Sequence, residues 1–247
     1  MPKERWKTRY LLFLVFVSFF TLCLTAVIAF LSPRVSDGFV WRRQLTGFTF
    51  SALCILGIFA VFFPQHCART PHKVISKRSD YSLQGENDVQ KSSSIGGVTV
   101  SHGHHPLCPP YRQHEFVFGK KTLCSACMGL FCGALISVAG ALYVFLQQFP
   151  YNLPYGIIFT LGAVLIVIGL GPYVIGHPLG PVWRFSFNAL MLVGMLLALV
   201  GVDGRAQSFA LNAFLISFFV FVLFTRIGLS QDKHEQICAT CGQTCAI

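Results

Sequence analysis

The chain has 247 residues, of which 54% are hydrophobic and only 11% are charged, and its formal net charge is +10. Soluble domains carry about a quarter charged residues, so this composition excludes an ordinary soluble domain and indicates an integral membrane protein. Basic residues that face anionic lipid explain the positive charge, so we expect a lipid bilayer as partner and no nucleic acid.

Six apolar stretches are long enough, or nearly so, to cross the roughly 30 Å hydrocarbon layer as helices. They are residues 10–31, 45–63, 123–146, 155–175, 185–200 and 208–224. None of them contains Asp, Glu, Lys or Arg, which argues against a proton- or ion-coupled transporter. The first stretch is too long for the apolar core of a signal peptide, so we expect a retained helix. The predicted fold class is an all-α integral membrane protein, a bundle of about six transmembrane helices.

Four segments are expected along the chain. Residues 1–64 are predicted to form a transmembrane hairpin, and residues 65–101, with few apolar residues, a flexible polar linker that cannot bury a core. Residues 102–228 combine a Cys/His motif with four helices, and residues 229–247 form a Cys-rich tail. In the third helix, Gly129, Gly133 and Gly140 give a small-residue face suited to close helix packing.

The distribution of Lys and Arg predicts the orientation of the helices. Threading six helices through a bilayer puts most of the 19 Lys and Arg residues on the side that holds both termini, including those of the long segment 64–122. Because basic residues accumulate on the cytoplasmic side, we expect a cell-membrane protein with both termini in the cytoplasm. The conspicuous Cys and His residues outside the helices then face the cytoplasm, where structural disulfides are disfavoured and clustered thiols indicate metal binding or catalysis.

A CxxC pair, Cys124 and Cys127, opens the third predicted helix. The unpaired N–H groups and the dipole at a helix N-terminus favour thiolate, which is the form that binds a metal. A tetrahedral site needs two more ligands. The preceding segment contains four candidates for these two positions: His104, His105, Cys108 and His114. The spacing leaves open whether three cysteines and one histidine or two of each would bind. Cys23, Cys54 and Cys132 lie inside apolar stretches and are expected to be packing residues.

The tail "CATCGQTC" places Cys238, Cys241 and Cys245 in a CxxCxxxC pattern with Gly242 after the second cysteine. A CxxCG turn is typical of a zinc knuckle, and glycine permits the tight turn. Three cysteines are one ligand short of a tetrahedral site. The fourth is either His234, or the tail folds back onto Cys124 and Cys127 to form one shared site.

The stretch "HHPLCPPYRQHEFVFGKKTLCSACMGLFCG", residues 104–133, resembles a family of uncharacterised prokaryotic polytopic membrane proteins that carry a domain of unknown function. Members have HHPxC, a following His and CxxCxGL, or a Cys-His pair followed by CxRCxGxYxG. The resemblance covers about thirty residues. It implies a metal site at Cys124 and Cys127 with ligands among His104, His105, Cys108 and His114, but it implies no substrate.

These patterns favour a membrane scaffold or complex subunit in which a structural zinc-type site holds the cytoplasmic segments. The alternatives are a membrane metalloenzyme, for which Glu115 is the nearby carboxylate, and a CxxC thiol redox protein. Transport of a metal through the helices is a fourth alternative. Zinc is the expected metal and iron the second candidate, because thiolate and imidazole ligands accept both. No catalytic residue, substrate or particular protein partner follows from the sequence.

Overall fold

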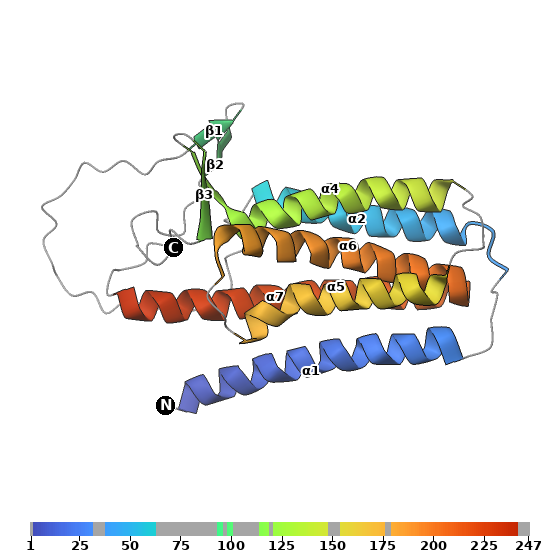
Figure 1. The fold of residues 1–247 in the computed structure, drawn as a ribbon, viewed down its shortest axis with the longest axis horizontal. Helices are drawn as coiled ribbons and strands as arrows, with labels where there is room; N and C mark the ends of the chain where they lie inside the picture. Colours follow the sequence, from blue (N-terminus) through green and yellow to red (C-terminus); the bar gives the residue numbers. More distant parts are fainter. Residues whose placement is uncertain are drawn as a thin grey trace, which may run out of the picture.

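The computed structural model describes residues 2–31, 38–62, 93–95, 98–100, 114–118, 121–147, 154–175 and 179–241. Its helices are α1 (Pro2–Leu31), α2 (Arg42–Phe62), α4 (Ser125–Leu146), α5 (Tyr155–Ile175), α6 (Pro181–Ala206) and α7 (Phe209–Cys241). They run roughly antiparallel in an elongated bundle (Figure 1). Within the described ranges, six helices are long and apolar enough to cross a membrane, which confirms the predicted all-α, six-helix architecture.

The core of the bundle forms around α6, which packs against α4, α5 and α7. Met191, Met195 and Leu199 of α6 are at most 1% exposed and belong to the same buried cluster as Phe219 of α7. The ring of Phe219 packs edge-on against Phe50 of α2. Other apolar side chains, on the outer faces of all six helices, are exposed, as expected for helices that meet lipid. The apolar periodicity therefore does not separate inside from outside, and packing decides which face is buried.

Glycines bring the helix backbones close together, as the sequence predicted for α4. A Cβ on Gly129 would collide with the backbone of Phe185, a Cβ on Gly133 with the backbone of Ala189, and a Cβ on Gly140 with Leu196. All three neighbours belong to α6, so the small-residue face of α4 is the face that docks on the central helix.

The two helices of residues 1–64 pack mainly on different helices of the bundle. Helix α1 packs mainly on α7, whereas α2 packs mainly on α4 (Figure 1). Small polar side chains contribute to the α1–α7 contact, where the hydroxyl groups of Ser18 and Thr225 lie 3.5 Å apart.

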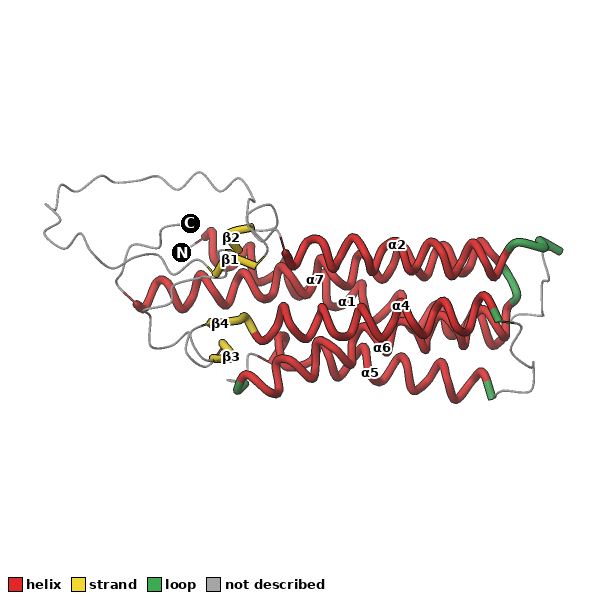
Figure 2. The backbone as a smooth tube through the Cα atoms, turned by 90° about the horizontal axis from the view of Figure 1, so that it is seen from above, coloured by secondary structure: helices red, strands yellow, loops and turns green. Residues whose placement is uncertain are grey.

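Two short antiparallel hairpins lie at one end of the bundle, where α1 also begins and α7 ends (Figure 2). Strands β1 (Ser93–Ile95) and β2 (Val98–Val100) pair with each other, as do β3 (Glu115–Phe118) and β4 (Lys121–Cys124). The β1–β2 hairpin is the described part of segment 65–101, where the composition indicated only a linker. The rest of that segment lies outside the described residues.

Four helices extend beyond the predicted bounds and include charged residues. Helix α1 begins at Pro2 rather than at residue 10, and α6 begins at Pro181 rather than at residue 185. Helix α2 begins at Arg42 rather than at residue 45, α6 continues to Ala206 rather than to residue 200, and α7 continues to Cys241 rather than to residue 224. The helices therefore contain Arg184, Asp203 and Arg226, and the predicted absence of ionisable residues is corrected. The reason is that Asp203 and Arg226 have partners on other helices, which a hydropathy pattern cannot reveal.

Candidate functional site

The CxxC pair lies where strand β4 runs directly into helix α4. Cys124 is the last residue of β4 and the N-cap of α4, with extended backbone angles, and Cys127 lies in the first turn of the helix. Pairing of Cys124 with Glu115 in the β3–β4 hairpin fixes the approach of the chain to the helix. The sequence therefore places the first sulfur of the pair beside the unpaired N–H groups of a helix N-terminus.

Cys124 is a thiolate at neutral pH, because its surroundings lower the pKa of its thiol from 9.0 to about 5. The largest cause is a hydrogen bond with the side chain of Cys127, while burial of the sulfur acts in the opposite direction. The N–H groups of Cys127 and Ala126 and the positive charge of Arg226 lower this pKa further. Thiolate is the nucleophilic and metal-binding form of cysteine.

The segment before β3 brings His114 to the same place. The hydroxyl of Ser125, the first residue of α4, donates a 2.8 Å hydrogen bond to the carbonyl oxygen of His114. Burial lowers the pKa of the His114 imidazole from 6.5 to about 4, and the charge of Arg184 lowers it further. His114 is therefore neutral at pH 7, which is the form of imidazole that binds metals.

A ring contact holds the hairpin against the bundle. The ring of Phe116 in β3 packs edge-on against Phe185 of α6, with the centroids 6.1 Å apart. Because Phe185 is also the residue that Gly129 of α4 approaches, hairpin, α4 and α6 meet at one point. The two cysteines and His114 therefore come from elements that support one another.

A buried polar network lies behind the cysteine pair. Arg226 of α7 is only 6% exposed, its guanidinium lies 5.0 Å from the centroid of the Tyr173 ring in α5, and its Nη2 lies 3.3 Å from the Tyr173 hydroxyl. The same hydroxyl accepts a 2.6 Å hydrogen bond from Nδ2 of Asn188 in α6. Arg226 interacts electrostatically with both Cys124 and Cys127. Sequence reasoning treated Arg226 only as a topology determinant, because its partners are far away in the chain.

The described residues cover only part of the predicted ligand set. His114, Cys124 and Cys127 are brought to one end of α4. Four predicted ligands lie outside the described residues: His104, His105, Cys108 and Cys245. The last turns of α7 contain Cys238 and Cys241. The backbone there is helical up to Cys241, whereas a CxxCG turn was expected. Among the residues that the structure describes, no three His, Cys, Asp or Glu side chains are close enough to hold a metal.

The other cysteines behave differently from the pair at α4. Cys54 is buried in the core, as predicted for a packing residue, whereas Cys23 is exposed on α1 and Cys132 is half-buried in α4.

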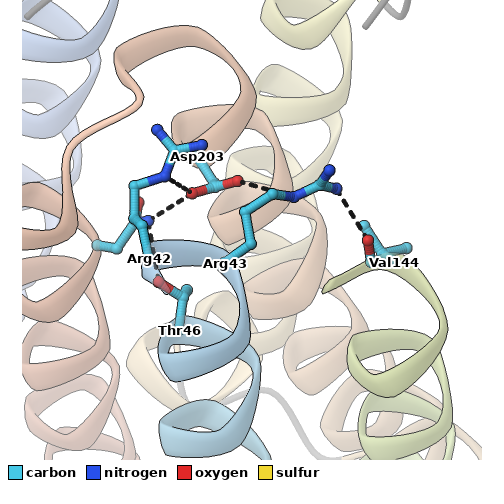
Figure 3. Close-up of polar contacts among 6 residues, drawn as sticks. Arg42, Arg43, Thr46, Val144 and Asp203 are labelled. Carbon is cyan, nitrogen blue, oxygen red and sulfur yellow. Dashed lines mark hydrogen bonds and ion pairs between the residues drawn. The ribbon is translucent and has the colours of Figure 1, made fainter. Parts of the chain in front are cut away.

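A second polar cluster occupies the opposite end of the bundle and was also missed. Asp203 near the end of α6 lies 3.2 Å from Nε of Arg42 and 3.8 Å from Nε of Arg43, and both arginines belong to the first turn of α2. Figure 3 shows the arginines reaching the carboxylate from two sides, while Arg43 also donates a 2.9 Å hydrogen bond to the carbonyl oxygen of Val144 in α4. Asn212 of α7 donates to Asp203 at 2.7 Å. This cluster therefore joins α2, α4, α6 and α7.

Comparisons with models of protein families, with curated proteins and with solved structures find no match for this chain. The resemblance of residues 104–133 to a family of prokaryotic membrane proteins therefore stays a prediction, and the proposed function rests on Cys124, Cys127 and His114 and their surroundings.

The lowered pKa of Cys124 predicts a distinctive pH profile. In metal-free folded protein, the rate of Cys124 alkylation by iodoacetamide should fall with a midpoint near pH 5, because only the thiolate reacts and its pKa is about 5. Since the folded pKa is below the ordinary value, the interaction stabilises the fold fully above pH 9.0 and is lost as the pH falls toward 5. Mass spectrometry of the peptide that contains Cys124 measures the rate, with the denatured chain as control. A native midpoint equal to that of the denatured chain would contradict the assignment.

Proposed function

We propose that this protein is a multi-pass membrane protein in which the end of the bundle carrying Cys124 and Cys127 holds a metal, with zinc as the expected ion. The observation that supports it is the pairing of protonation states at one place: a thiolate at Cys124 and a neutral imidazole at His114. These are the forms in which the two side chains bind zinc, and both are stable at neutral pH without a metal. Zinc would supply a tetrahedral cross-link between the hairpin and α4.

The proposed role of this site is structural, in a scaffold or in a subunit of a membrane complex. The β3–β4 hairpin has four-residue strands and is too small to bury a core of its own. A metal bound by residues of the hairpin and of α4 would hold it in one position on the bundle. Such a site needs no substrate pocket, which makes the structural role the simplest function consistent with these residues. A protein partner would then dock on the stabilised end.

The proposed location is the cell membrane, with the site and both termini in the cytoplasm. The support comes from the six apolar helices and from the excess of Lys and Arg on the side of the termini. In the reducing cytoplasm the thiols of Cys124 and Cys127 stay available as ligands.

Thiol redox chemistry is the second candidate function. The observation that favours it is the hydrogen bond between the side chains of Cys124 and Cys127, which places the two sulfurs close together and stabilises one of them as a thiolate. A pair of this kind also exchanges with disulfides through the thiolate.

Metal content decides between these proposals. Full-length protein purified in detergent without chelators should contain zinc, and Cys124→Ser and Cys127→Ser should each lose most of it, because each removes a thiolate ligand. Cys132→Ser is the matched control, because it changes a half-buried cysteine of the same helix outside the pair. Wild-type protein without bound metal, but with two titratable thiols at residues 124 and 127, would refute the metal site and support thiol redox chemistry. An iron absorption spectrum would correct the identity of the metal.

A further inference from the structure

Arg226 is a buried cation, so a group that balances its positive charge is expected nearby. It is 6% exposed, and its Nε has no hydrogen-bond partner among the described residues. Arg42 and Arg43 form ion pairs with Asp203 at the far end of the bundle, whereas Arg226 has no ion pair at 4 Å or less among the described residues. An uncompensated buried charge costs several kcal/mol, so a cation held in this way normally has a negative partner nearby.

The close contacts that orient Arg226 are with Tyr173. The Tyr173 ring lies under the guanidinium, and the Tyr173 hydroxyl interacts with Nη2. Arg184, the other cation in this region, repels Arg226 and is itself attracted by Cys124. Tyr173 attracts Arg226 most strongly, and the other groups that attract it are the sulfurs of Cys127 and Cys124.

The network fixes the guanidinium from three different helices. Tyr173 belongs to α5, Asn188 to α6 and Arg226 to α7, and the Tyr173 hydroxyl is contacted by both of the other side chains. Asn188 is held in turn by a hydrogen bond from its Nδ2 to the carbonyl oxygen of Arg184, 2.5 Å away. Side chains of three helices therefore fix the position of the charge.

We infer that Arg226 is the counter-cation of the Cys124–Cys127 pair, a positioning residue that maintains a positive potential at the two sulfurs and favours anionic species bound there. This inference deepens the proposed function, since it names the residue that stabilises a thiolate-containing metal site. It also joins the site to α7, whose last turns carry Cys238 and Cys241. A change in the position of α7 would therefore change the potential at the cysteine pair.

The test compares two alkylating reagents of similar size and different charge on the full-length, metal-free protein in detergent. Iodoacetate is an anion and iodoacetamide is neutral, and both react with the same thiolate. The ratio of their rates at Cys124 cancels the thiolate fraction and the exposure of the sulfur, so it reports the local potential. Mass spectrometry of the peptide that contains Cys124 separates this cysteine from the others.

We expect Arg226→Gln to lower the iodoacetate-to-iodoacetamide ratio by at least about threefold, because a unit charge close to the sulfur is removed in a medium of low dielectric constant. Arg226→Lys should retain most of the ratio, since it keeps the charge. Arg42→Gln is the matched control: it removes a buried arginine from the far end of the bundle and should leave the ratio unchanged.

An unchanged ratio in folded Arg226→Gln would overturn the inference, as would an equal loss in Arg226→Lys, which would indicate a packing role. If the variants do not fold, the wild-type protein still provides a test: the ratio at Cys124 must be higher in the folded chain than in the denatured chain. Equal ratios in the two states would refute the inference. Because this measurement uses no metal, its result is independent of whether the wild-type protein binds zinc.

Discussion

Replacing Asp203 with Asn should destabilise the fold by about 3–5 kcal/mol, because it removes the negative partner of two arginines and leaves their charges uncompensated. Asp203 is 3% exposed and interacts with Arg42, Arg43 and Asn212, so the substitution affects contacts between three helices. The measurement is the midpoint of unfolding by heat or denaturant in detergent, followed by circular dichroism.

Arg205→Gln is the control for this prediction. Arg205 lies two residues from Asp203 in the last turn of α6, and it is half-buried rather than buried. Its replacement changes the net charge by one unit, as Asp203→Asn does, and should shift the midpoint by far less. An equal loss of stability in the two variants would show that helix-end charge, and not the buried ion cluster, determines stability.

Replacing Gly162 with Ala should destabilise the packing of α5 on α6 by about 1–3 kcal/mol, since a methyl group cannot fit between the two backbones. A Cβ on Gly162 would lie 2.6 Å from the carbonyl oxygen of Gly194 and would also collide with the backbone nitrogen of Ala198. Backbone atoms cannot rotate away as a flexible side chain can, so the helices themselves must separate. The change should appear as a lower unfolding midpoint.

Gly171→Ala is the matched control, because it adds the same methyl group to the same helix at a position where no heavy atom lies within 4 Å. Alanine has a higher helix propensity than glycine, so this variant should be neutral or slightly more stable than the wild-type protein. A loss in Gly171→Ala as large as that in Gly162→Ala would mean that the effect comes from the glycine backbone of α5 rather than from its contact with α6.

The polar cluster at the end of α6 also changes what the helices imply about function. Sequence reasoning counted no ionisable residue within the apolar stretches and used this to argue against coupled transport. The structure places Asp203 and Arg226 inside helices α6 and α7. Both lie toward the ends of the bundle, in networks that join several helices. Asp203 contacts arginines of α2 and Arg226 contacts Tyr173 of α5, and contacts of this kind between helices suit the proposed scaffold role.

The sequence alone was sufficient to predict that the chain forms a bundle of six long apolar helices. Apolar runs of about twenty residues specify helices long enough to cross a membrane, because the backbone must satisfy its own hydrogen bonds in lipid. The spacing of Gly129, Gly133 and Gly140 indicated the docking face of α4, since glycines three to four residues apart share one side of a helix. The CxxC at the start of α4 was also evident, because the motif and the helix N-terminus are adjacent in the chain.

Only the tertiary structure decided which residues from distant parts of the chain meet. Arg226 is more than one hundred positions from Cys124, and Asp203 is as far from Arg42, so no local pattern pairs them. The same limitation applies to the order of the helices: α1 packs on α7 and α2 on α4, although α1 and α2 are neighbours in the sequence. Hydrophobicity determines that a segment is helical and buried in lipid, whereas shape and the pairing of buried charges determine its neighbours.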